Sequence, residues 1–386
     1  MKEKVIIFSK KDGFFNNEGF FIFDKPFIKI RYKSNILTIN NKKIKTKNPL
    51  PIVEKLVKKS KGYAVGFFSY DLKELILGKK KLGRDLIDMP LIYINIYRKY
   101  TYKDKAFIPE DVGNVYSISY PDKNKFLDIV KKAKKYIESG DIYQVNLSHR
   151  IEISGSFYTE NIFFKIANYQ PTPFLMYIKD KSFSLISASM ELFLKKEKDK
   201  LVTKPIKGTR PRGKTKEEDK KLQEELFKSE KEKAENLMIT DLMRNDLGRI
   251  SRKKSVKVER LFEIEKYETL FQMSSTITSI LKKNTSLKDI IYNTFPPGSV
   301  TGAPKIRAME IIDELEEYKR HVYCGATFLI KPDFDFTMSV AIRQSIFQKD
   351  RCFVYIGAGI VYDSDPQKEY EETILKAKAN IKPLTD

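Results

Sequence analysis

Short apolar runs, separated by proline, glycine and charged residues, fill the first part of the chain. They predict strands at Val5–Ser9, Phe20–Phe23, Phe27–Tyr32 and Asn35–Thr38. Gly62–Asp71 combines small and aromatic residues in one run, which indicates a buried strand. We therefore expect residues 1–108 to form a β-rich N-terminal region.

Strand and helix patterns are mixed in residues 120–386. Lys123–Ser139 places its apolar residues on one helical face. Further helices are predicted at Lys216–Asn245, Pro304–Glu316 and Pro366–Ile381. Strands are predicted at Ile142–Ile151, Phe174–Ile178, Phe183–Ser187, Phe328–Ile330, Phe336–Ile342 and Cys352–Ile360. Because most strands come in adjacent pairs, we expect an α+β fold with large, mainly antiparallel sheets flanked by helices.

Between the two regions, Ile108–Asp122 contains two prolines and a glycine without an apolar period, which makes it the best linker candidate. No run approaches the roughly 18–20 apolar residues of a membrane helix, and the N-terminus lacks a signal-peptide pattern. Cys324 and Cys352 give neither a disulfide framework nor a zinc spacing. We therefore expect a cytoplasmic protein outside the membrane.

The formal net charge of +22 raises the question of nucleic-acid binding. Much of the lysine is scattered or interleaved with glutamate, as in Lys214–Lys233, and no nucleic-acid-binding motif is present. We therefore do not expect nucleic-acid binding. A basic surface would also favour a small polyanionic substrate.

Residues 204–213 read Lys-Pro-Ile-Lys-Gly-Thr-Arg-Pro-Arg-Gly and fix Lys207 between Pro205 and Gly208, close to two arginines. Like charges and burial both lower the pKa of a lysine, which would make part of its amine nucleophilic at physiological pH. A solvated basic loop would have the same composition. Lys207 alone leaves both interpretations open.

Two predicted helices each carry a pair of glutamates three residues apart. The pairs are Glu232 with Glu235, and Glu369 with Glu372. Residues at this spacing share one face of a helix. Carboxylates alone, in a chain with two histidines, suit a hard ion such as Mg²⁺. Two solvated helix faces are the alternative interpretation.

The second glutamate pair follows an apolar strand that ends in Gly357-Ala358-Gly359. Glycines let backbone N–H groups approach a ligand closely. Asp365 as N-cap, with Pro366 at the first helical position, fixes the register of the helix. A strand, a glycine turn and a carboxylate-bearing helix together predict a site for an anion and a metal ion.

Three further features could contribute to a site. Glu191 lies between two apolar strands, where burial would raise the pKa of its carboxyl group, as a general acid requires. Arg343 is a lone cation in an apolar strand, and a buried arginine usually has a carboxylate partner in the protein or in a substrate. Pro296–Lys305 fails the spacing of a phosphate loop, so it is either a loop that positions a helix N-terminus or a structural turn.

Taken together, these segments resemble those of the chorismate-using enzymes, a family that includes anthranilate synthase component I and aminodeoxychorismate synthase component I. The resemblance rests, in chain order, on residues 140–146 (Gly-Asp-Ile-Tyr-Gln-Val-Asn), Met190–Leu194, Pro205–Gly213, Ala234–Arg249, Gly298–Glu314, Tyr323–Gly325, Ala341–Arg343 and Gly357–Lys376. It implies that residues 120–386 form a chorismate-binding catalytic domain. Residues 1–108 would then be the N-terminal region of the component I fold.

The resemblance also implies roles for the candidate residues. Glu235 and Glu372 would hold Mg²⁺, with Glu232 and Glu369 supporting them, and the metal would bind the ring carboxylate of chorismate. Glu191 would protonate the 4-hydroxyl group as it leaves.

The remaining residues would hold the substrate. By the same resemblance, Arg343 and Tyr323 would bind the enolpyruvyl carboxylate. The N–H groups of Gly357-Ala358-Gly359 and the ammonium group of Lys376 would form a cradle for the dianion, and Thr209 would line the ring pocket.

Three positions distinguish the branches of the family. Gln144 stands where the isochorismate- and salicylate-forming relatives have a lysine base, so activated water is not the expected nucleophile. Lys207 resembles the lysine that attacks C2 of the ring in the aminodeoxychorismate branch, whereas anthranilate enzymes resemble Pro-Ile-Ala-Gly-Thr here. Gln272 stands where anthranilate synthases carry a histidine tied to pyruvate elimination, which favours a product that keeps its enolpyruvyl group.

We therefore expect the aminodeoxychorismate activity, on the path to 4-aminobenzoate and folate. Anthranilate synthase component I is the alternative, and a non-catalytic basic binding protein is an alternative of a different class. The family usually takes ammonia from a separate glutamine amidotransferase subunit. Because the sequence offers no Cys-His-Glu triad for glutamine hydrolysis, we expect such a partner in addition to the substrate chorismate.

Overall fold

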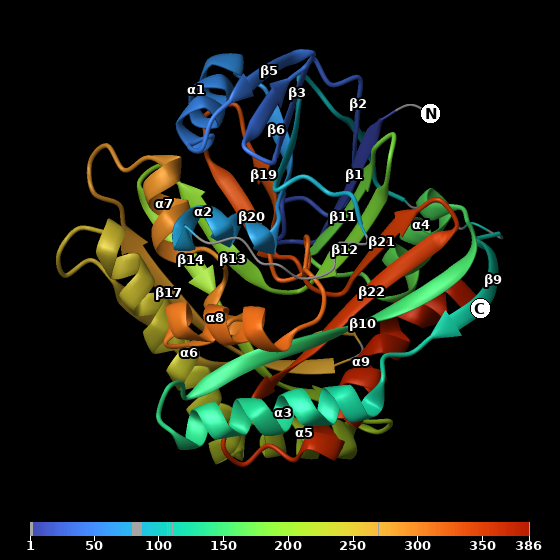
Figure 1. The fold of residues 1–386 in the computed structure, drawn as a ribbon, viewed down its shortest axis with the longest axis vertical. Coiled ribbons are helices and arrows are strands. Elements are labelled where there is room, and N and C mark those ends of the chain that lie inside the picture. Colours follow the sequence, from blue (N-terminus) through green and yellow to red (C-terminus); the bar gives the residue numbers. More distant parts are fainter. Residues whose placement is uncertain are drawn as a thin grey trace.

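The structure is a computed structural model that describes residues 3–78, 87–105, 107, 109, 111–268 and 270–385. Ile108 and Asp386, at which two of the predicted regions end, lie outside the described residues. Two large β-sheets with helices around them make up the described part of the chain (Figure 1).

Ten strands form the first sheet. In spatial order they are β18 (Gly302–Ala303), β10 (Gln144–Phe157), β22 (Arg351–Ile360), β21 (Gln344–Gln348), β12 (Ser184–Ser189), β11 (Phe174–Lys179), β1 (Lys4–Ser9), β2 (Gly19–Asp24) and β8 (Thr101–Lys103), and β9 (Gly113–Ser119) pairs with β10. The long antiparallel pair of β10 and β22 places Asn146 opposite Gly359.

Twelve strands form the second sheet. Their order is β15 (Ile206–Pro211), β17 (Leu270–Ile280), β14 (Lys200–Lys204), β13 (Leu192–Glu197), β20 (Phe336–Val340), β19 (Ala326–Ile330), β6 (Tyr63–Phe68), β7 (Ile92–Tyr97), β3 (Ile28–Lys33), β4 (Ile36–Ile39) and β5 (Lys42–Lys45), and β16 (Lys257–Lys266) pairs with β17. These pairings are antiparallel as well, which confirms the predicted fold class.

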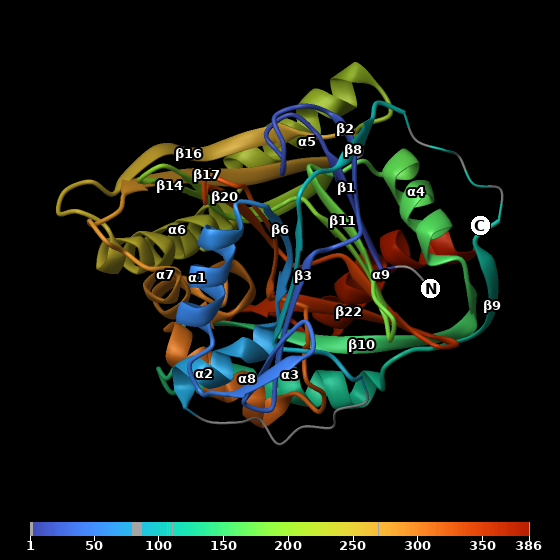
Figure 2. The ribbon, with the colours of Figure 1, turned by 90° about the horizontal axis from the view of Figure 1, so that it is seen from above.

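Helices surround the sheets. They are α1 (Leu50–Ser60), α2 (Glu74–Leu77), α3 (Lys123–Glu138), α4 (Thr159–Tyr169), α5 (Lys216–Lys228), α6 (Glu230–Ile250), α7 (Leu287–Thr294), α8 (Lys305–Leu315) and α9 (Pro366–Thr385), with short 3-10 turns η1 (Tyr70–Lys73) and η2 (Gly298–Val300). Helix α9 packs on β22 and contacts α3, whereas α5 and α6 pack on β15 and β17 (Figure 2). Among the described residues, no helix is long and apolar enough to cross a membrane.

Strands from the N-terminal region complete both sheets. Strand β1 pairs with β11, and β6 pairs with β19. The division of the chain into residues 1–108 and 120–386 stays a prediction, but the two parts share their sheets in the described residues.

Two of the predicted elements are wrong in detail. The linker candidate Ile108–Asp122 contains β9, whose side chains are mostly exposed because it lies on the outer side of β10. The single helix predicted at Lys216–Asn245 is two helices, because Ser229 is extended between them and its side chain caps the start of α6.

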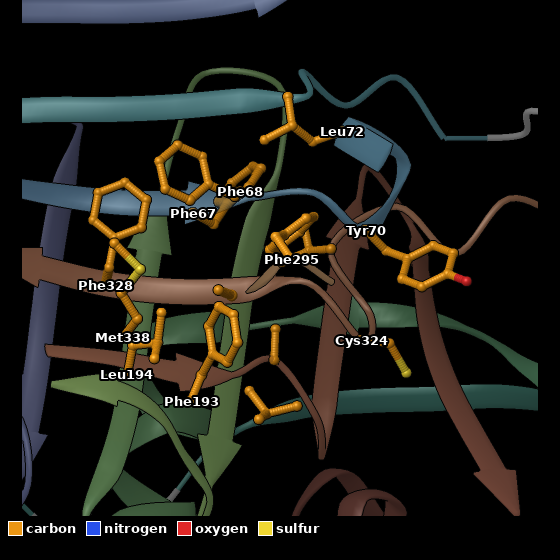
Figure 3. Packing of buried hydrophobic residues seen from close by; sticks show 14 of the residues in the cluster. Phe67, Phe68, Tyr70, Leu72, Phe193, Leu194, Phe295, Cys324, Phe328 and Met338 are labelled. Carbon is orange, nitrogen blue, oxygen red and sulfur yellow. The ribbon is translucent and has the colours of Figure 1, made fainter. Parts of the chain in front are cut away.

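The main hydrophobic core lies between the two sheets. Phe68 on β6 contacts Phe328 on β19 with ring centroids 4.6 Å apart, and its ring also meets the edge of Phe295 (Figure 3). A second cluster fills the space between the outer face of the first sheet and helices α4 and α9. Both faces of the first sheet are therefore covered.

Two of the places where the chain passes from one sheet to the other lie side by side. Met190 and Glu191 connect β12 to β13, and Ala341–Arg343 connect β20 to β21. Backbone hydrogen bonds join these two connections. The N–H of Val340 donates to the carbonyl of Glu191, and that of Ala188 donates to Arg343, both at 3.0 Å.

Phe68→Ala should lower the free energy of unfolding by about 3–5 kcal/mol, because it leaves a cavity in the core between the sheets. The same substitution at Phe227, which is 51% exposed on α5, should cost less than about 1 kcal/mol. Urea unfolding followed by circular dichroism measures both. Equal losses in the two variants would contradict this placement of the core.

Candidate functional site

Lys207 lies on β15, at the edge of the second sheet, and its side chain points toward β22 of the first sheet. Its Nζ is 3.8 Å from Oε2 of Glu235 on α6. A Cβ atom built on Gly359 would lie 3.1 Å from the same Nζ. The structure therefore brings the predicted lysine, one predicted metal ligand and the predicted glycine segment together between the two sheets.

Burial lowers the pKa of Lys207. Lys376 on α9 lowers it further, whereas the carboxylates of Glu235, Glu191 and Glu232 act in the opposite direction. All four charged groups are near enough to act on one amine, so the structure gathers residues from β15, α6, α9 and the β12–β13 connection around Lys207. Their roles stay predictions.

The two arginines next to Lys207 in the sequence do not cause its shift, contrary to the sequence-based expectation. Arg210 Nη1 donates to Glu232 Oε1 at 3.2 Å, and Arg212 binds both carboxylate oxygens of Asp219. Each arginine is thus neutralised by its own carboxylate. Burial dominates the shift of Lys207 instead.

Glu191 is 4% exposed in the connection between the sheets. Burial raises the pKa of its carboxyl group to about 7, although a hydrogen bond from Ser299 and the positive charge of Lys207 lower it in part. Its backbone N–H donates to Ser189 Oγ at 3.1 Å, which fixes the residue. A carboxyl group of this kind can hold a proton near neutral pH, as the sequence predicted.

The glutamates of α6 face β15. Because Ser229 caps the helix, Glu232 lies in its first turn and Glu235 follows one turn later. Glu232 accepts a hydrogen bond from Arg210, and Glu235 lies beside Lys207.

The glutamates of α9 differ from each other in environment. Asp365 Oδ1 accepts from the N–H of Lys368, which confirms it as the N-cap. Glu369 is 9% exposed and accepts from Ser364 Oγ at 2.7 Å, and burial raises the pKa of its carboxyl group. The half-exposed Glu372 carboxylate binds Lys376 Nζ at 2.6 Å.

The pKa of Glu372 is lowered, even though its partial burial acts to raise it. Lys376, Lys231 and Lys207 outweigh the burial. The negative charge of Glu372 is thus held by lysines from α6, α9 and β15.

Carboxylates from two helices fit a hard cation such as Mg²⁺ in their donor chemistry. In the present arrangement, however, Glu235 faces Lys207 and Glu372 faces Lys376. Within the described residues, no three His, Cys, Asp or Glu side chains come close enough together to hold a metal ion. The carboxylates therefore have the donor chemistry that Mg²⁺ requires, but in this structure two of them are paired with lysine ammonium groups.

The segment Gly357-Ala358-Gly359 lies within β22 and pairs with β10, so it is not the turn that the sequence suggested. A Cβ atom on Gly357 would lie 3.0 Å from the hydroxyl oxygen of Tyr323. Tyr323 itself stacks on Tyr355, with ring centroids 5.7 Å apart. The glycines therefore leave space between the strand and the side chains that face it.

Arg343 lies where the chain enters β21, with φ at 49°. Its Nη1 is buried and makes no hydrogen bond, and no carboxylate of the described residues acts on the pKa of its guanidinium group. Burial lowers the pKa of its guanidinium group to about 10. Of the two partners that the sequence left open, a substrate carboxylate fits this geometry better.

Thr209 and Lys376 are less enclosed than the other candidates. Thr209 is exposed on β15, and its backbone lies opposite Gln272 of β17. The side chain of Lys376 is 49% exposed at its ion pair with Glu372. These two residues therefore lie at the solvent-exposed edge of the group of side chains around Lys207.

Sequence reasoning missed several residues of the site. Ser299, on η2, is 7% exposed and hydrogen-bonds the Glu191 carboxyl group, so the loop Pro296–Lys305 does border the site. Arg320 is buried and donates to Glu316, to the Val300 carbonyl and to the Asn146 carbonyl. The sequence signal for Arg320 is the i, i+4 spacing from Glu316, but only the structure shows that this pair is buried.

Comparison with known families and curated proteins gives one consistent result. The sequence model of a family described as chorismate binding enzyme matches residues 4–382. Anthranilate synthase component 1 of Aquifex aeolicus (strain VF5) is 43% identical over 262 residues, which cover 68% of this chain and 53% of that protein. Aminodeoxychorismate synthase component 1 of Bacillus subtilis (strain 168) is 35% identical over 364 residues, 84% of this chain and 77% of that protein. The chain thus spans about half the length of the Aquifex relative.

Solved structures show the same fold. Anthranilate synthase component I from Streptococcus pneumoniae TIGR4 superposes with a TM-score of 0.83 at 30% identity, covering 93% of this chain and 91% of that one. The menaquinone-specific isochorismate synthase MenF from Escherichia coli has a TM-score of 0.78 at 14% identity, over 99% of this chain and 89% of that one. At that identity the likeness concerns the fold alone.

Glu191→Gln should be more stable than the wild type at pH 8 and equal to it at about pH 4. Because the pKa of Glu191 is raised from 4.5 to about 7, the wild type loses stability as pH rises from about 4.5 to about 7, and the difference is constant above that range. The gain is up to about 3 kcal/mol in the free energy of unfolding. Urea unfolding at several pH values measures it. A pH-independent difference, or the same pattern in the exposed control Glu217→Gln, would contradict the burial of this charge.

Proposed function

We propose that this chain, which belongs to the family of chorismate binding enzymes, converts chorismate and ammonia to 4-amino-4-deoxychorismate. Such a product is the precursor of 4-aminobenzoate and so of folate. The observation that carries the proposal is Lys207, a buried amine on β15 that lies beside Glu235 and Gly359 and within electrostatic reach of Glu191.

The lysine supports a covalent route. Burial favours the neutral amine, which can attack C2 of the chorismate ring. As the C2–N bond forms, the two conjugated ring double bonds shift toward C4 and the C4–O bond breaks, with the oxygen leaving as water on the proton of Glu191. Ammonia then attacks C4, the double bonds shift back and the C2–N bond breaks, so that Lys207 leaves as a neutral amine. The new C4 ammonium group returns a proton to the Glu191 carboxylate.

Glu191 supports the same step from the leaving-group side. Its carboxyl group holds a proton up to about pH 7 and can give it to the 4-oxygen, which leaves as water. Ser299 fixes the orientation of the carboxyl group through their hydrogen bond. Burial thus acts on both groups in the direction that the step needs, because it favours the protonated acid and the neutral amine.

Other residues of the site would orient the substrate through its enolpyruvyl carboxylate and its ring. Arg343, with an unpartnered Nη1, and Tyr323 would bind the enolpyruvyl carboxylate. The strand Gly357-Ala358-Gly359 leaves room for the ring, while Lys376 and Thr209 stand at the rim. A dianionic substrate would also be attracted by the net charge of +22.

Glu235 and Glu372 are the residues that would hold Mg²⁺, with Glu232 and Glu369 behind them. When bound, the ion would polarise the ring carboxylate of chorismate and so help the 4-hydroxyl group to leave. The lysines that now neutralise these carboxylates would have to move aside. Metal binding and lysine release would thus be coupled.

The ammonia would come from a glutamine amidotransferase partner, with which we propose that the chain acts. Anthranilate synthase activity is the second candidate, because the Aquifex relative at 43% identity and the Streptococcus structure carry that name. Gln272 on β17 is 6% exposed and an amide, which cannot act as a histidine would in pyruvate elimination. This position supports the aminodeoxychorismate activity over the alternative.

Incubation of the purified chain with chorismate, MgCl₂ and ammonium at alkaline pH should yield an amine that retains the enolpyruvyl group, separated by chromatography and identified by mass. Lys207→Ala should reduce its formation at least about 100-fold, because it removes the nucleophile. Lys204→Ala, on β14, which precedes β15 in the chain, is the matched control. Fluorescent anthranilate as the product would favour anthranilate synthase activity. An undiminished rate in Lys207→Ala would refute the covalent route.

Glu235→Gln and Glu372→Gln should each weaken Mg²⁺ binding by about 10-fold or more, because each removes one anionic oxygen ligand. Equilibrium dialysis or calorimetry with MgCl₂ measures binding without turnover. The exposed Glu371→Gln, on the same helix as Glu372, is the control. Wild-type affinity in both site variants would refute the metal assignment.

A further inference from the structure

A cavity of about 450 Å³ lies beside β10, and neither Lys207 nor Glu191 lines it. It is bounded by α3 and α8, which pack against β10 and against each other (Figure 2). Strand β18 pairs only with the first two residues of β10, and β9 pairs with it from Glu152 onward. Residues 148–150 therefore face the cavity from an edge of β10 that no described strand covers.

The buried floor of the cavity carries Arg150, which is 5% exposed. Its Nη2 donates to Glu152, and the hydroxyl group of Tyr355 also acts on the guanidinium group. Its Nε is buried and, within the described residues, donates no hydrogen bond. The ring centroid of Tyr318 lies 3.8 Å from the guanidinium carbon, so a further partner must approach at the N–H edge. A buried donor without an acceptor costs free energy, which an acceptor on a ligand would recover.

The carboxylates that line the cavity already have partners within the protein. Besides Glu152, which binds Arg150, these partners are Arg320 for Glu316, Lys125 for Glu317, Lys131 for Asp128 and the N–H groups in the first turn of α3 for Asp122. Their negative charges are therefore compensated from outside the cavity or at its mouth. An anionic ligand would meet the unpaired donor of Arg150 and no uncompensated carboxylate on the floor.

Apolar and aromatic side chains form the walls of the cavity. Phe126 and Ile129 come from α3, and Leu315 and Tyr318 come from the end of α8 and the segment after it. The mouth is lined by the exposed charged residues Asp122, Lys125, Asp128, Lys132 and Glu317. A matching ligand has a negative charge at its inner end, a flat apolar body and a polar group at its outer end.

We propose that this cavity is a second binding site, which takes a small aromatic carboxylate of the size of a substituted benzoate. The carboxylate accepts a hydrogen bond from Arg150 Nε, the ring lies between the apolar walls, and a polar substituent faces the charged mouth. A carboxylate without a ring would leave the walls unfilled, and a neutral ring would leave Nε unpaired. The site does not depend on the proposed function, because neither Lys207 nor Glu191 belongs to it.

Titration calorimetry of the full chain with 4-aminobenzoate tests the site. The wild type should bind this probe. It should bind 4-aminobenzamide, which has the same ring without the negative charge, at least about 10-fold more weakly, because one charge-assisted hydrogen bond is lost. Acetate, which has the charge without the ring, should also bind more weakly, because it makes no contact with the walls.

Arg150→Gln should weaken the binding of 4-aminobenzoate by about 10-fold or more, because it removes the donor on the floor. Arg351→Gln is the matched control, since Arg351 also lies near Glu152, at 3.7 Å, but is exposed and does not line the cavity. Arg343→Gln distinguishes this cavity from the proposed substrate site. Both of these variants should keep the affinity of the wild type.

The proposal would be overturned by a wild type that does not bind 4-aminobenzoate up to about 10 mM, by unchanged affinity in Arg150→Gln, or by an equal loss in Arg351→Gln or Arg343→Gln. Should Arg150→Gln be recovered unfolded, Ile129→Trp decides instead. Its larger side chain on α3 would fill the cavity, so unchanged affinity would overturn the proposal. A chain that binds the probe as expected but makes no amine from chorismate would overturn the proposed function alone.

Discussion

The site depends on one constraint, which is that two segments cross between the sheets side by side. The crossing from β12 to β13 carries Glu191, and the crossing from β20 to β21 carries Arg343. Backbone hydrogen bonds tie each crossing to the other, and the carbonyl of Ala341 also accepts from Cys324, next to Tyr323. The proposed acid and the proposed carboxylate-binding groups are therefore fixed by main-chain pairing and not by their side chains alone.

The ion pairs near these two crossings are of two kinds, which differ in burial. Arg320 and Glu316 are both buried and satisfy each other, and they tie β10 to the η2 loop through main-chain carbonyls. Removal of one partner would leave an uncompensated buried charge, so the pair acts as a fixed support. The ion pair of Lys376 and Glu372, near Lys207, lies half in solvent by contrast. The buried pair of Arg320 and Glu316 is therefore the fixed part of the site, and the pair of Lys376 and Glu372 is its solvent-exposed part.

The sequence predicted the architecture well because alternation and helical periodicity are local signals. The two neighbouring strands predicted at Phe174–Ile178 and Phe183–Ser187 are confirmed, and they pair with each other directly. β9 was missed because its pairing with β10 depends on distant residues. In the site, the raised pKa of Glu191 could be predicted from its apolar neighbours. The charge environment of Lys207 could not, because Arg210 and Arg212 find partners on α5 and α6 that no local pattern indicates.

The side-by-side crossings also have a mechanical consequence. The packing of one sheet on the other sets the offset between them, and Glu191 and Arg343 lie at two of the points where the chain bridges that offset. A small slide of the sheets would shift both groups together while each strand kept its internal register. The alignment of the proposed acid with the proposed carboxylate-binding arginine is therefore a property of the packing between the two sheets.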